Sequence, residues 1–310
     1  MHNHFIFWII FTIIVGVMFY IDLFITEHRK GKLGIKTSLI WSGVWISAAF
    51  FFSALIFTFS ENGNKIAIEF LTGYLIEKSL SVDNLFVFLM IFGFMNVRDE
   101  HQPHVLKWGI LTAIVLRIIF IIGGVALIRF FHPIIYLFGI FLMYAAFKMA
   151  FFSENKTDFS RSPIIKYFSK KSNILDYYQG KKFFVTKDKK LYFTPLFITF
   201  LLIESADLLF AVDSIPAVIA ITHDPFTIIT SNIFAILGLR ALYFALREVV
   251  ELFVYLKYGV AVILAFVGIK MLIADIFTIP TLISLAVIII CLFISIVASL
   301  VKRKRKYFSS

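Results

Sequence analysis

The chain has 310 residues, of which 60% are hydrophobic and only 16% are charged, and its mean hydropathy is +0.93. Soluble domains average about 25% charged residues, so this composition excludes an ordinary soluble enzyme and predicts one polytopic membrane bundle without a second globular domain. The net charge of +11 does not indicate a nucleic-acid partner, because the basic residues lie between apolar segments. We expect no removable signal peptide, because the apolar span that begins at Phe5 has neither a basic region before it nor a small-residue cleavage site. The single cysteine, Cys291, excludes an intramolecular disulfide.

Nine segments are apolar over about 20 residues, the length of a helix that crosses a bilayer. We place them at 5–26, 38–59, 67–95, 105–130, 134–152, 191–222, 226–246, 253–275 and 279–301. His132-Pro133 and His223-Asp224-Pro225 are expected to provide the breaks at the two shortest turns. The predicted fold is therefore an all-α, polytopic integral membrane helix bundle of about nine transmembrane helices, and residues 1–310 form a single membrane transport domain in contact with the lipid bilayer.

The basic residues also predict how the chain is oriented. Of the 30 lysines and arginines, 23 lie in the connections that follow the first, third, fifth, seventh and ninth segments. The opposite connections hold Lys65, with Arg129 at their edge. The positive-inside rule then places the N-terminus outside and the C-terminus in the cytoplasm, in a multi-pass protein of the inner cell membrane.

The longest connection, residues 153–190, is predicted to be a cytoplasmic loop between two halves of the chain. It is amphipathic around residues 164–168, and residues 183–186 and 191–193 would form a small β-hairpin around Lys187–Lys190. Its lysines would either rest on anionic lipid or simply be solvated.

The third and sixth segments carry acidic residues in apolar surroundings. Glu77 and Asp83 lie in the third, and the sixth holds Glu204, Asp207 and Asp213. A carboxylate at the centre of a transmembrane helix costs about 2.5–3.5 kcal/mol on insertion scales, so such residues usually line a polar cavity or bind a cation. The alternative is a set of structural ion pairs with buried cations of neighbouring helices.

Both segments contain two acids that are six residues apart, and the predicted topology gives the two segments opposite directions. An inverted repeat with a site near the midplane would produce this arrangement. Acids six apart lie about 120° around a regular helix, so they cannot grip one small ion unless the helix is broken. Pro216 would provide such a break, because it cannot donate to the carbonyl of Val212.

The polar groups of these segments are oxygen ligands, which suit hard divalent cations such as Mg²⁺, Ca²⁺ and Mn²⁺. We predict a metal site formed by Glu77, Asp83, Asn84, Glu204, Asp207, Asp213 and Ser214, with Asp22, Ser79, Ser205 and Arg117 as accessory residues.

Three further polar residues lie inside predicted segments. Arg117 must find a partner: it would pair with one of the acids, hold the empty site neutral, or join a proton relay. Lys78 is expected to serve packing or to extend toward the interface. For Asn232 an interhelical hydrogen bond is favoured over the alternative role of a ligand. The sequence contains no P-loop, Rossmann or haem motif, so we predict no cofactor, no enzymatic activity, and transport that is secondary or passive.

At its acidic stretches the sequence resembles the TerC/Alx family of integral membrane proteins. The matching stretches are residues 77–88 and 204–217, together with 178–185 and 192–196 in the loop between them. The resemblance extends over residues 20–300. The family commonly has His at position 179 and Gly at position 189, where this chain has Gln and Lys. The resemblance implies a multi-spanning exporter of a divalent metal, with Mn²⁺ as the favoured cargo, and the family's tellurite-resistance name denotes a phenotype.

The leading hypothesis is a secondary transporter that exports Mn²⁺ through a carboxylate-lined site between the third and sixth segments, driven by proton exchange. The alternative is a membrane scaffold or binding subunit of a metal-stress or tellurite-resistance complex, which recruits partners through the cytoplasmic loop. An intramembrane aspartyl hydrolase is disfavoured because the Gly-x-Gly-Asp pattern is absent. The sequence leaves protein partners and oligomeric state open.

Overall fold

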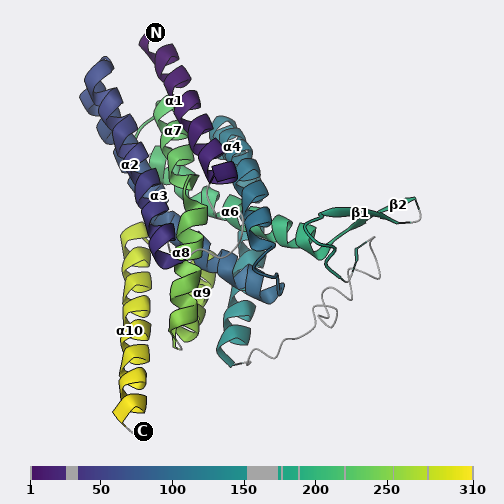
Figure 1. Ribbon diagram of the computed structural model, residues 1–310. Helices are drawn as coiled ribbons and strands as arrows, with labels where there is room; N and C mark the ends of the chain where they lie inside the picture. The colour runs from purple at the N-terminus through teal and green to yellow at the C-terminus, as the bar shows by residue number, and fades with distance from the viewer. Residues whose placement is uncertain are drawn as a thin grey trace.

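The computed structural model describes residues 2–25, 34–151, 174–175, 177–187, 189–219, 221–253, 255–277 and 279–308. These residues form nine α-helices, one short π-helix and one β-hairpin (Figure 1). The helices are α1 (His2–Tyr20), α2 (Ile35–Phe59), α3 (Gly63–Phe94), α4 (Gln102–Phe151), α6 (Pro195–Ile219), α7 (Pro225–Ile236), α8 (Leu239–Leu252), α9 (Leu256–Leu272) and α10 (Thr281–Phe308). The π-helix η1 (Ile21–Ile25) continues α1.

The structure confirms an all-α membrane helix bundle. Among the described residues, three helical stretches are long and apolar enough to cross a membrane: Ile35–Phe59, Gln102–Gly123 and Pro195–Ile219. Four shorter apolar stretches accompany them, and large side chains such as Phe59, Ile122 and Leu137 are at least 70% exposed on the outer face of the bundle. Such exposure in an apolar chain is what contact with lipid requires.

The nine helices are consistent with the predicted number, but two boundaries differ. The fourth and fifth predicted segments lie in the single helix α4, which continues through His132-Pro133. Proline is tolerated inside membrane helices because neighbouring groups satisfy the freed carbonyl. Conversely, the seventh predicted segment is divided into α7 and α8, which meet at Leu237-Gly238. Gly238 has a φ of +85°, a left-handed conformation that favours glycine and ends a helix.

The break predicted before α7 is present. Asp224 caps the helix by accepting hydrogen bonds from the Thr227 amide at 3.0 Å and the Thr227 hydroxyl at 2.6 Å, and Pro225 occupies the first helical position. Proline is favoured there because the amide that it lacks would have no partner in the first turn.

The interruptions predicted for the third and sixth segments are absent, because α3 and α6 are each continuous. Pro216 lies in the last turn of α6, three residues before its end at Ile219, where the loss of one backbone hydrogen bond does not stop the helix. The structure instead interrupts the seventh predicted segment, between α7 and α8.

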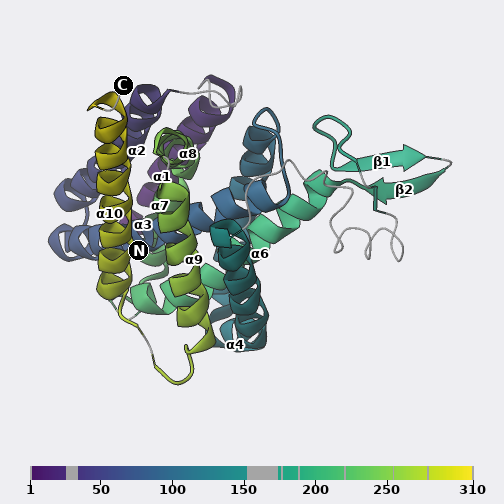
Figure 2. The ribbon, with the colours of Figure 1, turned by 90° about the horizontal axis from the view of Figure 1, so that it is seen from below.

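The hairpin follows the predicted pattern. Strand β1 (Phe184–Lys187) pairs antiparallel with β2 (Lys190–Phe193), so that Phe184 is opposite Phe193 and Lys187 opposite Lys190. It extends away from the bundle at the start of α6, on the side opposite α10 (Figure 2). The amphipathic stretch 164–168 lies outside the described residues.

Two hydrophobic clusters surround α3. One joins α3 to α4, α6 and α9, and the other is an aromatic cluster of Phe11, Phe52, Phe70, Phe226 and Phe234 from α1, α2, α3 and α7. Helices α4 and α9 approach closely at a pair of glycines, since a Cβ on Gly139 would lie 3.1 Å from the Gly268 carbonyl oxygen. Helix α3 is thus held between the two clusters, and its residues Glu77, Lys78 and Asn84 contact α4, α7 and α6.

Candidate functional site

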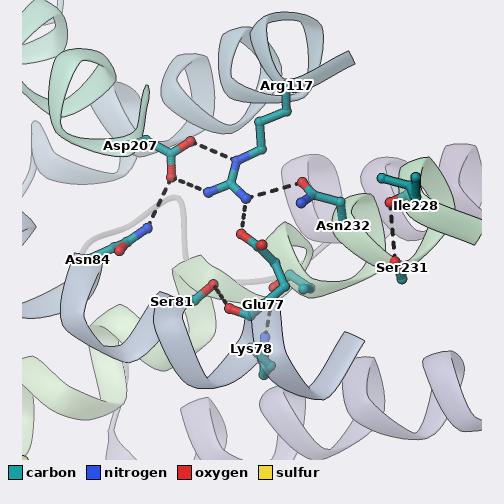
Figure 3. Close-up of polar contacts among 10 residues, drawn as sticks. Glu77, Lys78, Ser81, Asn84, Arg117, Asp207, Ile228, Ser231 and Asn232 are labelled. Carbon is teal, nitrogen blue, oxygen red and sulfur yellow. Dashed lines mark hydrogen bonds and ion pairs between the residues drawn. The ribbon is translucent and has the colours of Figure 1, made fainter. Parts of the chain in front are cut away.

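Arg117 of α4 is the centre of a buried polar cluster (Figure 3). Its side chain is 1% exposed, yet its guanidinium contacts three helices. Nε donates to Asp207 Oδ2 at 3.1 Å and Nη2 to Asp207 Oδ1 at 2.9 Å, which is a bidentate ion pair with α6. Nη1 donates to Glu77 Oε1 of α3 and to Asn232 Oδ1 of α7 at 3.1 Å. A single cation therefore joins α3, α4, α6 and α7.

Small residues bring these helices close enough for the contacts. A Cβ added to Gly73 of α3 would lie 2.9 Å from the Ser231 Oγ of α7. A Cβ on Gly109 of α4 would lie 3.1 Å from Glu204 Oε1 of α6. Small residues at helix crossings allow membrane helices to approach each other closely and to form polar contacts.

Asn84 orients the Asp207 carboxylate from a second direction. Its Nδ2 donates to Asp207 Oδ1 at 3.2 Å, so this one oxygen accepts from both Asn84 and Arg117. Asn84 and Glu77 are both on α3, seven residues apart, which places them on one helix face. One face of α3 thus supplies both an acid and an amide to the cluster.

Glu204 lies one helical turn before Asp207 and lines a small cavity of about 20 Å³, enough for one water molecule or small ion. Its side chain is 93% buried, and neither carboxylate oxygen has a hydrogen-bond partner among the described residues. The nearby Thr112 hydroxyl donates to the carbonyls of Trp108 and Gly109, at 2.8 and 3.1 Å, and lies close enough to interact with the Glu204 carboxylate. The cavity therefore has a carboxylate in its wall whose oxygens lack a hydrogen bond of normal geometry among the described residues.

The cluster has more oxygen and more acid than its own donors can satisfy. Among the described side chains, four groups of α3 and α6 keep buried oxygens without a hydrogen-bond partner: Glu77 Oε2, Asn84 Oδ1, both oxygens of Glu204, and Ser214 Oγ. Buried polar atoms are nearly always paired, so such a group indicates a water or ion site. With all three acids ionised, Glu77, Glu204 and Asp207 against Arg117 give a net charge of −2.

The structure brings together some of the predicted site residues and not others. Glu77, Asn84, Asp207 and Arg117 are in direct contact, and Glu204 lies beside them. Asp83 and Ser214 are buried on the same two helices, whereas the side chain of Asp213 lies outside the described residues. Within the described part of the chain, no three His, Cys, Asp or Glu side chains are grouped so as to hold a metal ion in this conformation.

The accessory residues other than Arg117 have different environments. Ser79 and Ser205 donate to the carbonyls of Leu75 and Leu201 on their own helices, and Ser205 is exposed on the outer face. Asp22 of η1 forms a separate buried ion pair, in which its Oδ2 accepts from Arg240 Nη1 at 2.9 Å. These three residues are not part of the Arg117 cluster.

Two features near the site were not predicted from the sequence. Of the two roles expected for Lys78, the structure agrees with packing, but its contact was not predicted: the ammonium donates to the carbonyls of Ala235 and Leu237 at 3.1 and 3.3 Å, at the end of α7. Arg240, two residues after Gly238, lines the Glu204 cavity. Gly238, a glycine inside an apolar run, was the sequence signal that could have predicted the helix break before Arg240, but an isolated glycine is a weak helix breaker. The predicted interhelical hydrogen bond of Asn232 is confirmed by its contact with Arg117.

Comparison with known proteins identifies the family. The model described as "Integral membrane protein TerC family" matches residues 62–307. The chain belongs to the TerC family of integral membrane proteins. It is 44% identical over 294 residues to a Salmonella typhi protein named "Putative membrane-bound redox modulator Alx", covering 93% of this chain and 91% of that protein.

Other relatives also match over most of the chain. The Alx protein of Escherichia coli K12 is 45% identical over 285 residues, covering 90% of this chain and 89% of its own length. A protein of Rickettsia bellii named "Uncharacterized membrane protein" is 42% identical over 296 residues, covering 96% of this chain and 97% of that protein. No solved structure matches the chain significantly. The acidic stretches of α3 and α6 both lie within the matched family region.

Proposed function

We propose that this TerC-family protein is a secondary transporter that exports a divalent metal cation, with Mn²⁺ as the favoured cargo. The site is the Arg117 cluster and the Glu204 cavity, between α3, α4, α6 and α7. We propose the inner cell membrane as its location, with the N-terminus outside and the C-terminus in the cytoplasm, on the basis of the lysine and arginine distribution.

The observation that supports this proposal is the surplus of buried, unpartnered oxygens around a cluster of three acids and one arginine, whose net charge is −2 when all three acids are ionised. Carboxylate, amide and hydroxyl oxygens are the ligands that hard divalent cations prefer, and a charge of −2 matches one such ion. Structural ion pairs alone would leave the acids and bases of the cluster in balance. Here Arg117 balances only one of three acids.

Transport in the outward direction requires a source of energy. Moving a divalent cation out against an inside-negative potential of about 100 mV costs about 4.6 kcal/mol, from about 2.3 kcal/mol per charge. We propose exchange for protons that the same carboxylates carry once the cation has left. In proteoliposomes, acidifying the side to which the ion is released should then accelerate transport. A rate that ignores the pH gradient would exclude proton exchange.

The test of the function is Mn²⁺ flux into proteoliposomes that contain the full-length protein and a trapped metal-quenched dye. Wild type should transport Mn²⁺, and Glu204→Gln should reduce the rate to near that of protein-free vesicles. The matched control is Ser205→Ala, one residue away on the exposed face, which should stay within about twofold of wild type. Equal rates for Glu204→Gln and wild type, or no flux by wild type, would contradict the proposal.

The hairpin favours a second candidate function, that of a scaffold that recruits a partner. Phe184 and Leu191 are 45% and 51% exposed on a hairpin that extends away from the bundle, beside several lysines (Figures 1 and 2). Replacing residues 183–193 by a short Gly-Ser turn tests this alternative. A scaffold would lose its cellular role while Mn²⁺ flux in proteoliposomes stayed intact, whereas a transporter would keep both.

A further inference from the structure

The guanidinium of Arg117 occupies the position that a cation shared by α3 and α6 would need. Its Nη1 contacts Glu77, and its Nε and Nη2 contact Asp207, so both acids are directed at one group. An ion that used a carboxylate from each helix would have to displace this guanidinium. The cluster therefore already contains a cation, covalently attached to α4.

We infer that Arg117 is a tethered competitor that makes the site selective for divalent over monovalent cations. This inference rests on the proposed function and adds a specificity-determining residue to it. An ion enters the site only if it displaces Arg117 from Glu77 and Asp207.

The selectivity follows from charge and tethering. Coulomb energy is proportional to the product of the charges, so at equal distance a divalent ion gains about twice the attraction of a monovalent one. A monovalent ion such as K⁺ offers the acids the same charge as the guanidinium. It must also compete with a group whose attachment gives it an effective concentration in the millimolar range or above. Divalent ions overcome this competition and monovalent ions do not.

When Arg117 is displaced from the acids, its guanidinium can keep its hydrogen bond to Asn232. Arg117 Nη1 already donates to Asn232 Oδ1 at 3.1 Å, and this amide carries no charge that the incoming ion would compete for. The Asn232 Nδ2 has no partner among the described residues, so the amide is not locked by a second hydrogen bond. When the carboxylates turn to the ion, Arg117 therefore retains a neutral acceptor on α7.

The experiment measures Mn²⁺ binding to the full-length protein in detergent, from the spectrum of free Mn²⁺ in electron paramagnetic resonance. Each titration is performed in KCl and in choline chloride of the same ionic strength, so that screening is equal and only the size of the monovalent cation differs. Wild type should give the same Kd in both salts.

The decisive variant is Arg117→Gln combined with Glu77→Gln. It removes one positive and one negative charge, so the net charge of the ionised cluster is unchanged while the tethered cation is lost. We expect Mn²⁺ to bind about tenfold more tightly in choline chloride, and KCl to weaken binding to this variant by a similar factor. The control is Lys78→Met, which removes a neighbouring buried cation that contacts only carbonyls among its described partners and should change neither Kd.

A second variant keeps the test decisive if the double variant does not fold. Arg117→Lys retains the tethered charge but loses the bidentate bond to Asp207, so it should bind Mn²⁺ several-fold more tightly than wild type and remain indifferent to K⁺. A folded double variant that ignores K⁺, or Arg117→Lys binding no tighter than wild type, would overturn the inference and leave the proposed transport intact. Absence of Mn²⁺ binding by wild type would overturn both.

Discussion

Arg117 and Arg240 are both 1% exposed inside the bundle, yet they have different surroundings. Arg117 contacts two acids and an amide from three helices, beside a third acid, Glu204. Arg240 contacts one residue among those described, Asp22, through its carboxylate at 2.9 Å and its backbone carbonyl at 3.2 Å. The first centre has an excess of acid, whereas the second is balanced one to one.

This difference separates a binding site from a structural ion pair in the same bundle. A balanced buried pair has no affinity left for another cation, and its members are needed because either one alone would be an uncompensated charge. An acid-rich centre still attracts a further cation after the charge of its own arginine has been balanced. Replacing an acid by its neutral amide should therefore mainly reduce transport at the first centre and mainly reduce stability at the second.

The largest expected effect is the loss of transport by Asp207→Asn. The substitution keeps the volume of the side chain but removes a charge that the ion needs, and Arg117 retains Glu77 and Asn232 as partners. We expect Mn²⁺ flux in proteoliposomes to fall by about 100-fold or more. This is the size of the loss in rate when an enzyme loses one group that stabilises the charge of its transition state. The melting temperature should change little. Normal flux with Asp207→Asn would remove Asp207 from the site.

The next effect is on stability, at the second centre. Asp22→Asn leaves Arg240 buried with a neutral partner, and breaking a buried pair in this way costs about 3–5 kcal/mol. Thermal unfolding in detergent should therefore shift far more for Asp22→Asn than for Asp207→Asn. The combined variant Asp22→Leu and Arg240→Met should recover most of the loss, since an apolar pair of similar volume has no charge to compensate. A double variant as unstable as the single one would show that the pair has a role beyond its own charge balance.

The sequence was sufficient to predict the class of the fold, and that the third and sixth segments carry acids in apolar surroundings. Apolar length predicted the membrane bundle and a number of helices that agrees with the described residues, and the aromatic and β-branched residues on either side of Lys187–Lys190 predicted the hairpin. These features are local, because each depends on the composition of one segment. The predicted topology and the identity of the transported ion remain predictions.

The partners within the site could not be predicted, because they depend on helix packing. Arg117 and Asp207 are 90 positions apart, and Arg240 and Asp22 are 218 apart. Hydropathy places all four in the membrane but does not say which helices are neighbours. Helix-breaking residues also misled the prediction in two ways. Helix α4 continues through Pro133, where a break was predicted, whereas Gly238 ends a helix where no break was predicted. Tertiary contacts decide whether a proline or a glycine breaks a membrane helix.

Gly238→Ala tests whether the α7–α8 break holds the second centre in place. A Cβ at this residue would lie 2.7 Å from Cδ1 of Trp45, and its φ of +85° is strained for alanine. We expect a destabilisation of about 2–3 kcal/mol, from backbone strain together with overpacking. Gly93→Ala is the control, because no atom lies within 4 Å of a Cβ there. Equal melting temperatures for the two variants would mean that the break tolerates an ordinary residue.

The smallest effect is expected at a third buried cation, Lys78, whose described contacts are the carbonyls of Ala235 and Leu237. Lys78→Met leaves those two carbonyls without their donor, which costs about 1–3 kcal/mol of stability. It also removes the free-energy cost of burying a charged ammonium. We therefore expect a net destabilisation of about 1 kcal/mol in thermal unfolding and unchanged Mn²⁺ flux, because no charge of the acid-rich centre is altered. If flux instead fell as far as with Asp207→Asn, Lys78 would belong to the transport site, and an excess of acid around a buried cation would no longer distinguish the functional centre from the structural ones.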